Sequence, residues 1–137
     1  PANLFVARFI GSPAMNIMPV TVIGTGDATR IKLKDGSEVT VDVATSASDQ
    51  GKAASFGVRP EDLAIATGDE FLFEGVVDIV EALGEVTLLY VNGPVEEEPV
   101  VVKLPGIVDV KKGQTLRFSA DKTKLHLFDA DGQTYRR

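Results

Sequence analysis

The sequence predicts a mostly β protein, a small barrel or sandwich built from short strands. Apolar and polar residues alternate along much of the chain, as in Ile31-Lys32-Leu33 and Val39-Thr40-Val41, and this period of two is typical of half-buried strands. Dipeptides that favour tight turns, such as Asp35-Gly36 and Lys112-Gly113, separate these runs. The length of 137 residues is typical of a single domain with its own core.

Nine segments have the alternation or the short apolar runs expected of strands. Gly75 interrupts the fifth of them and predicts a β-bulge or a sharp bend there. One helix is expected from Asn3 to Ile10, where apolar residues recur at spacings of three and four. Gly11-Ser12-Pro13 would end that helix. The expected strands cover residues 18–22, 30–34, 38–43, 54–58, 71–80, 86–91, 100–104, 115–119 and 125–128.

Two further features concern the organisation of the chain. Residues 45–52, with the sequence TSASDQGK, are small and polar, so we expect a loop that separates an N-terminal sheet from a second run of strands. In Arg59-Pro60, the proline favours an extended conformation for Arg59 and a turn directly afterwards.

Charge and composition exclude several classes of protein. The formal net charge of −6 repels polyanions, and no basic cluster offsets it, so nucleic acid is not an expected partner. The absence of cysteine excludes disulfides and thiolate chemistry. No segment resembles a signal peptide or a transmembrane helix, which favours the cytoplasm. The chain begins with Pro1 and not with Met, so we expect a processed protein or a piece of a longer one.

No motif predicts catalysis or metal binding. Gly51-Lys52 is followed by Ala53 and lacks the earlier glycine of a phosphate-binding loop. His126 is the single histidine and is interpreted as an ordinary strand residue. Residues 129–132 begin like a calcium loop but lack its later acidic ligands, and the Glu96-Glu97-Glu98 run is interpreted as a solvated hairpin tip.

Four blocks of sequence, in this order, resemble a known family. The first is residues 1–16, PANLFVARFIGSPAMN, and the second is residues 57–63, GVRPEDL. The third runs from Val80 to Thr87 and the fourth from Leu125 to Gly132. Together they resemble the C-terminal regulatory region of the ATP-binding subunits of carbohydrate-type ABC importers, the family of the maltose and glycerol-3-phosphate systems.

The resemblance implies a fold of TOBE-type, OB-like β-barrel units packed together after a connecting helix. Residues 1–13 would be the helix and turn that follow a nucleotide-binding domain, and residues 14–137 would be the regulatory domain. It implies no enzyme activity and no cofactor for this chain, because ATP and Mg²⁺ would bind in the preceding domain. It further implies a homodimer, membrane subunits contacted through the ATPase domain at the inner face of the plasma membrane, and a regulatory protein or small ligand.

The matched blocks supply four candidate regulatory or interface residues: Arg59, Glu61, Glu81 and Gly84. Arg59 presents a planar guanidinium that could pair with a carboxylate across an interface or with an anionic ligand. An ion pair with Glu61 or Glu81 inside the domain is an equally good interpretation. Glu81 could cap the turn at Leu83-Gly84 or contact a partner subunit, and Gly84 is interpreted as a bend.

The alternative to a regulatory and dimerisation domain is a free-standing small β-barrel that binds an oxyanion or a metabolite. The first block distinguishes the two hypotheses, because a free-standing protein needs no segment matched to an ATPase domain. We therefore favour the regulatory domain. The transported solute and the regulator are not encoded in these residues.

Overall fold

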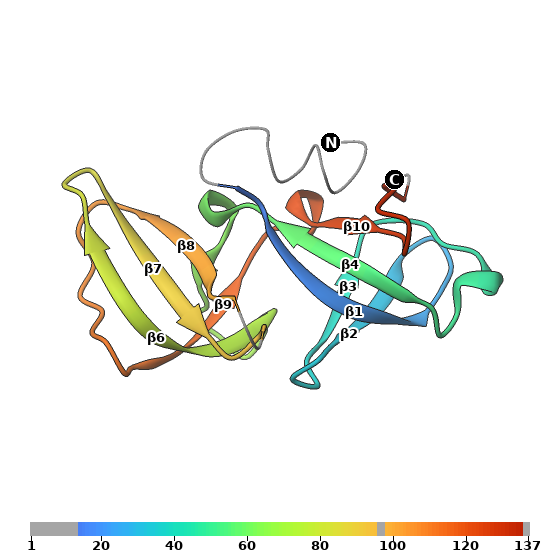
Figure 1. The fold of residues 1–137 in the computed structure, drawn as a ribbon, viewed down its shortest axis with the longest axis horizontal. Helices are drawn as coiled ribbons and strands as arrows, with labels where there is room; N and C mark the ends of the chain where they lie inside the picture. Colours follow the sequence, from blue (N-terminus) through green and yellow to red (C-terminus); the bar gives the residue numbers. More distant parts are fainter. Residues whose placement is uncertain (1–13, 96–97, 136–137) are drawn as a thin grey trace.

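The computed structural model describes residues 14–95 and 98–135. The expected helix from Asn3 to Ile10 and most of the Glu96-Glu97-Glu98 run lie outside the described residues. Within them, the protein folds as ten strands and three short 3₁₀ helices. The strands form two five-stranded antiparallel sheets that lie side by side along the longest axis of the molecule (Figure 1).

The first sheet has the strand order β10-β4-β1-β2-β3. Its strands are β1 (Asn16–Gly24), β2 (Thr29–Leu33), β3 (Glu38–Val41), β4 (Ala53–Val58) and β10 (His126–Phe128). The turn predicted at Asp35-Gly36 joins β2 to β3, and Gly36 adopts a φ of 94° that favours glycine. Helix η1 (Ala47–Asp49) lies in the polar loop between β3 and β4.

The second sheet has the order β5-β9-β6-β7-β8. Its strands are β5 (Ala64–Ile65), β6 (Phe73–Ala82), β7 (Val86–Asn92), β8 (Val100–Pro105) and β9 (Thr115–Ser119). Helix η2 (Pro60–Asp62) connects β4 to this sheet, and helix η3 (Lys122–Lys124) leads the chain back from β9 to β10. The last strand of the chain therefore completes the first sheet.

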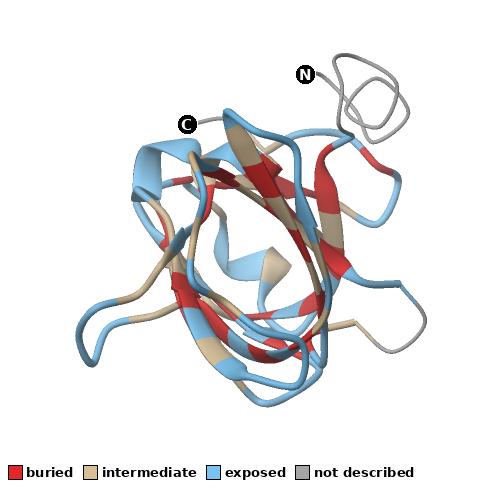
Figure 2. Ribbon diagram, turned by 90° about the vertical axis from the view of Figure 1, so that its left-hand side faces the viewer, coloured by how far each residue is buried: buried red, intermediate tan, exposed pale blue. Residues whose placement is uncertain are grey.

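The buried side chains of both sheets belong largely to one contiguous apolar cluster. Alternate residues of each strand point into it, so buried and exposed positions follow one another along the ribbon (Figure 2). Phe73 and Phe118, from neighbouring strands of the second sheet, pack with ring centroids 5.5 Å apart in its interior. Leu125 and Leu127 extend the same cluster into the first sheet.

The nine strands expected from the sequence are confirmed, with ends that differ by one or two residues. The expected boundary at residues 45–52 is wrong. Strand β4, which follows that loop, pairs with β1 from Asn16 opposite Val58 to Thr21 opposite Ala53, so it belongs to the first sheet. The chain crosses to the second sheet only after η2.

The bulge expected at Gly75 is displaced. Strand β6 runs through Gly75 without a break, and its pairing with β7 shifts register between Val77 and Ile79 instead. Gly75 has a different role, because a Cβ atom there would overlap Cγ1 of Val91 and lie 2.7 Å from the carbonyl oxygen of Asn92. Glycine is therefore required for the close approach of β6 and β7.

We predict that Gly75→Ala lowers the free energy of unfolding by about 1–3 kcal/mol, because the added methyl group overpacks a buried contact with backbone. Chemical denaturation in urea measures the change. Gly68→Ala is the matched control, since no atom lies within 4 Å of the added carbon there. Equal stabilities for the two variants would show that the β6–β7 contact relaxes without cost.

Candidate functional site

Arg59 and Glu61 lie where the chain passes from the first sheet to the second. Arg59 has an extended backbone, with φ −75° and ψ 146°, directly before η2, as Pro60 predicts. Its side chain is half-buried, and Glu61 is exposed in η2. Among the described residues, no salt bridge joins Arg59 to Glu61 or Glu81, and the two expected internal ion pairs are absent.

A side chain holds the two sheets together at this junction. Asn16 is the first residue of β1, and its side chain is buried. Its Nδ2 donates a hydrogen bond to the carbonyl oxygen of Val101 at 2.8 Å, and the amide of Val101 donates to Oδ1 at 2.9 Å. The carboxamide thus pairs with the outer edge of β8 as a neighbouring strand would. Helix η2 packs against the same strand.

Sequence reasoning missed this role of Asn16. Asn16 ends the first matched block, but it lies before the first expected strand, residues 18–22, so the alternation of apolar and polar residues indicates no role for it. Its partner is 85 residues away in the chain. A buried carboxamide needs partners for both its donor and its acceptor, which is the signal that could have indicated a structural role.

Glu81 and Gly84 lie in the β6–β7 hairpin, at the outer end of the second sheet and away from η2 (Figure 1). Gly84 adopts a φ of 90°, so the turn requires glycine for its backbone and not for lack of space. The structure therefore does not bring the four candidate residues together: Arg59 and Glu61 form one pair of positions, and Glu81 and Gly84 another.

Glu81 has a neighbour on β7 that sequence reasoning did not identify. The hydroxyl of Tyr90 donates a hydrogen bond to Oε1 of Glu81 at 3.3 Å. The pKa of Tyr90 is raised, first by burial and then by the negative charge of Glu81 and by this hydrogen bond. Glu81 accordingly belongs to the outer face of the second sheet and does not cap the Leu83-Gly84 turn.

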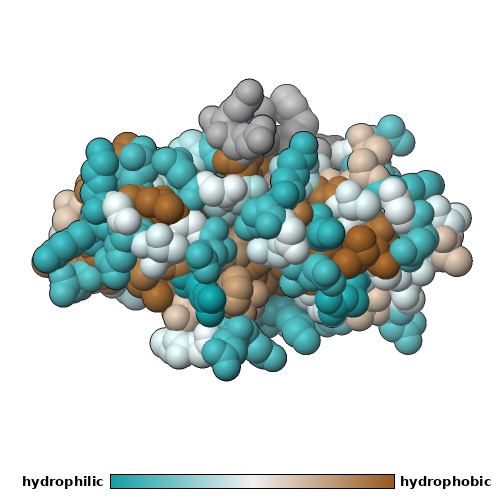
Figure 3. All heavy atoms as spheres, turned by 90° about the horizontal axis from the view of Figure 1, so that it is seen from below, coloured by the Kyte–Doolittle hydropathy of each residue, from teal (hydrophilic) through white to brown (hydrophobic). Residues whose placement is uncertain are grey.

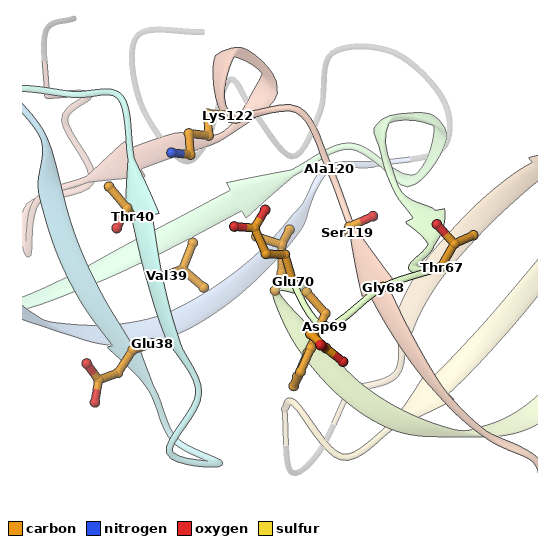
Figure 4. A pocket seen from close by; sticks show the side chains of 12 residues that line it. Glu38, Val39, Thr40, Thr67, Gly68, Asp69, Glu70, Ser119, Ala120 and Lys122 are labelled. Atoms are coloured by element: carbon orange, nitrogen blue, oxygen red, sulfur yellow. The ribbon is translucent and has the colours of Figure 1, made fainter.

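A concave surface lies between the two units (Figure 4). We call it the inter-sheet groove; it has a volume of about 640 Å³. One wall is strand β3, and the other comprises residues 67–72 with Ser119 and Ala120. Asp69 and Glu70 bring carboxylates to it, and Lys122 of η3 brings the single ammonium among its lining residues.

The remaining polar candidates have structural surroundings. His126 lies in β10 with its ring stacked near Phe128, as expected for a strand residue. Asp129 closes a surface turn, because its Oδ1 accepts hydrogen bonds from the amides of Asp131 and Gln133. Next to the groove, Asp121 caps η3, and the amide of Thr123 holds the pKa of this carboxyl below its usual range.

Within the described residues, no group of three or more acidic or histidine side chains is placed to hold a metal ion. The same residues contain no helix with the length and apolar character needed to cross a bilayer. Seen from below (Figure 3), apolar side chains reach the surface in separate patches among hydrophilic ones. The candidate surfaces are therefore the junction, the groove and the outer face of the second sheet.

Comparison with known protein families matches both units. Residues 11–63 match the family described as the MalK OB fold domain, and residues 56–128 match the TOBE domain family. The chain belongs to the TOBE domain family. The two matches overlap at Phe56 to Leu63, a segment that contains Arg59 and η2.

Named relatives support the assignment over the whole chain. The alpha-glucoside transport ATP-binding protein AglK of Rhizobium meliloti is 64% identical over 136 residues, which is 99% of this chain and 38% of that protein. The maltose/maltodextrin import ATP-binding protein MalK of Vibrio cholerae is 38% identical over 138 residues, covering 100% of this chain and 37% of that protein. The chain thus spans little more than a third of the length of these relatives.

Among solved structures, the cytoplasmic molybdate-binding protein ModG superposes with a TM-score of 0.65. The match covers 82% of this chain and 94% of ModG at 13% sequence identity. At that identity the likeness concerns the fold alone. It confirms the mostly β architecture of TOBE and OB units expected from the sequence.

We predict that Asn16→Ala lowers the free energy of unfolding by about 1–3 kcal/mol, because the amide and carbonyl of Val101 lose their partners. Asn16→Asp keeps the acceptor for the Val101 amide but loses the donor and sets a carboxylate against the Val101 carbonyl, so it is also destabilising. Thermal or urea unfolding measures both variants.

Gln50→Ala is the matched control for Asn16. Gln50 Nε2 also donates to a backbone carbonyl, that of Ile23 at 2.7 Å, but the bond is exposed to solvent. An effect of Asn16→Ala no larger than that of Gln50→Ala would show that the link between the sheets contributes little.

Glu81→Gln is expected to lower the pKa of Tyr90 toward the ordinary value for tyrosine, because the negative charge beside the phenol is removed. Tyr90 and Tyr135 are the two tyrosines of the chain, so absorbance titration of the phenolate resolves both. The pKa of Tyr135, raised by burial and by Asp49 and Asp129, is the internal reference. A Tyr90 titration identical in wild type and variant would contradict the contact.

Proposed function

We propose that this chain is the regulatory and dimerisation domain of the ATP-binding subunit of an ABC importer for sugars or related solutes. The observation that carries the proposal is the coverage of the match. Essentially the whole chain aligns with an ATP-binding transport protein at 64% identity, but the alignment covers only 38% of the length of that protein. On this proposal, the remainder of the protein supplies the ATP-binding machinery. This domain then lies beside the ATPase domains at the cytoplasmic face of the membrane, together with the membrane subunits.

The outer face of the second sheet supports self-association. Strand register places Ile79 beside Tyr90 and Tyr90 beside Val101 in one row across β6, β7 and β8. Ile79 is 48% exposed and Val76, on the same face of β6, is 44% exposed. We call Val76, Ile79, Leu88, Tyr90 and Val101 the outer apolar face. Exposed apolar surfaces of this kind mark interfaces.

The charges beside this face suit contact between two identical copies. In the next row, Glu81 of β6 and Lys103 of β8 flank Leu88 on opposite sides. A two-fold axis that lies in the contact plane and runs parallel to the strands would bring Glu81 of one copy to Lys103 of the other, so the surface can be self-complementary as a two-fold interface requires. On this proposal, Glu81 would have an interface role.

The groove does not favour the alternative, a free-standing oxyanion-binding barrel. ModG, which shares the fold, is a molybdate-binding protein. The lining of the inter-sheet groove, however, includes the carboxylates of Glu38, Asp69 and Glu70 and a single ammonium, that of Lys122. Carboxylates repel an oxyanion, so the groove offers an oxyanion no net attraction.

Ile79→Glu is expected to weaken homodimerisation of the chain by about tenfold or more, equivalent to about 1.4 kcal/mol, because it buries a carboxylate against apolar side chains. Sedimentation equilibrium over a wide concentration range gives the dissociation constant. Thr21→Glu, on the exposed face of β1 in the first sheet, is the control and should leave the constant unchanged. A wild-type chain that stays monomeric at millimolar concentration would contradict the dimer.

A further inference from the structure

Each sheet of this protein has two edge strands, and these edges differ in length and in how far they are paired. On the edge of β8, the carboxamide of Asn16 pairs with the backbone of Val101. The edge of β10 is bridged by the C-terminal segment, where Thr134 pairs with Phe128 and the amide of Tyr135 bonds to Leu127. Strand β5 has two residues. Strand β3 has no strand on its outer side within the described part of the chain.

The register identifies the backbone groups that this edge offers. The amide of Leu33 bonds to the carbonyl of Ser37, just before β3. In an antiparallel pair, successive residues direct their amide and carbonyl groups alternately toward the partner strand and away from it. Ser37, Val39 and Val41 therefore face β2. The amides and carbonyls of Glu38 and Thr40 point outward, away from the sheet.

That outward edge borders the inter-sheet groove. Glu38, Val39 and Thr40 line one wall, and the loop of residues 67–72 lines the other (Figure 4). Asp69 and Glu70 form no salt bridge with any described residue. A third carboxylate, that of Glu38, lies at the rim and accepts a hydrogen bond from Arg30 at 2.7 Å. Lys122 is the one cation of the lining residues.

We propose that the inter-sheet groove binds an extended, basic segment of a partner protein, which pairs with β3 as an added strand. Main-chain hydrogen bonds to Glu38 and Thr40 supply the pairing, as in other complexes formed by strand addition. Lysine or arginine side chains of the segment lie against Asp69 and Glu70, which selects a basic sequence. The first sheet would thereby gain a sixth strand.

The occupant is a peptide because the groove offers two complementary features at once. A small cation would use the carboxylates but leave the open strand edge without a partner. An acidic segment would use the edge but meet two unpaired carboxylates. The proposal concerns the first sheet, so it does not depend on self-association through the outer apolar face of the second.

The test uses the 137-residue chain and a short synthetic peptide of alternating lysine and valine. Two matched peptides separate the contributions: one has alternate backbone amides N-methylated, which removes strand pairing, and the other has glutamate in place of lysine. Titration followed by backbone amide NMR measures affinity and location together. The unmodified peptide is expected to bind, to shift residues 38–41 and 67–72, and to slow hydrogen exchange at the amides of Glu38 and Thr40.

Charge-removing variants of the chain provide the second arm. Asp69→Asn with Glu70→Gln is expected to weaken peptide binding by about threefold to tenfold, in line with two solvent-exposed ion pairs. The control, Glu85→Gln with Asp109→Asn, removes the same charge from exposed positions outside the groove and should not change the affinity.

Three outcomes would overturn the proposal. If the N-methylated peptide bound as tightly as the unmodified peptide, the binding would be a general electrostatic attraction that does not involve the edge of β3. Equal loss in both double variants would mean that net charge alone decides. Hydrogen-exchange protection of Glu38 and Thr40 that rises with chain concentration in the absence of peptide would show that a second copy of the chain occupies the edge.

Discussion

The relative placement of the two sheets depends on one side chain pairing with one strand edge. Asn16 places both a donor and an acceptor against the backbone of Val101, so the amide and carbonyl of this residue have partners without a further strand. Because the carboxamide is buried, each of these groups would be costly to leave without a partner. The start of β1, the end of β4 and helix η2 all meet at this point. The apolar cluster provides buried contact between the sheets. The hydrogen bonds of Asn16 fix the position of β1 relative to β8.

The strands could be predicted from sequence because each is a local pattern. Alternation at Ile31 and Leu33, or at Val39 and Val41, reports which face of a strand is buried, and Asp35-Gly36 reports a tight turn. Alternation carries no information about which strands are neighbours. For this reason β4 was expected in the second sheet, although it pairs with β1. Strand β5, with two residues, is too short to show any period.

The candidate site was predicted in part. The matched blocks located η2 and the β6–β7 hairpin, and Pro60 fixed the backbone of Arg59, but nothing in the sequence indicated that these positions lie apart. The row of Ile79, Tyr90 and Val101 depends on the register shift between Val77 and Ile79. Without the shift, Ile79 would occupy the opposite face from the one it shares with Tyr90. A bulge of one residue therefore decides where the exposed apolar surface lies.

The return of β10 to the first sheet has a consequence for how the protein is made. Strand β4 obtains its outer neighbour from residues 126–128, near the end of the described chain. During synthesis, residues 16–58 therefore leave the ribosome with one sheet edge open, and they remain so until the whole second sheet has been translated. Contacts of such long sequence separation form slowly, and an open edge is a site for misassembly. We therefore expect the first sheet to be completed only after the second has been made.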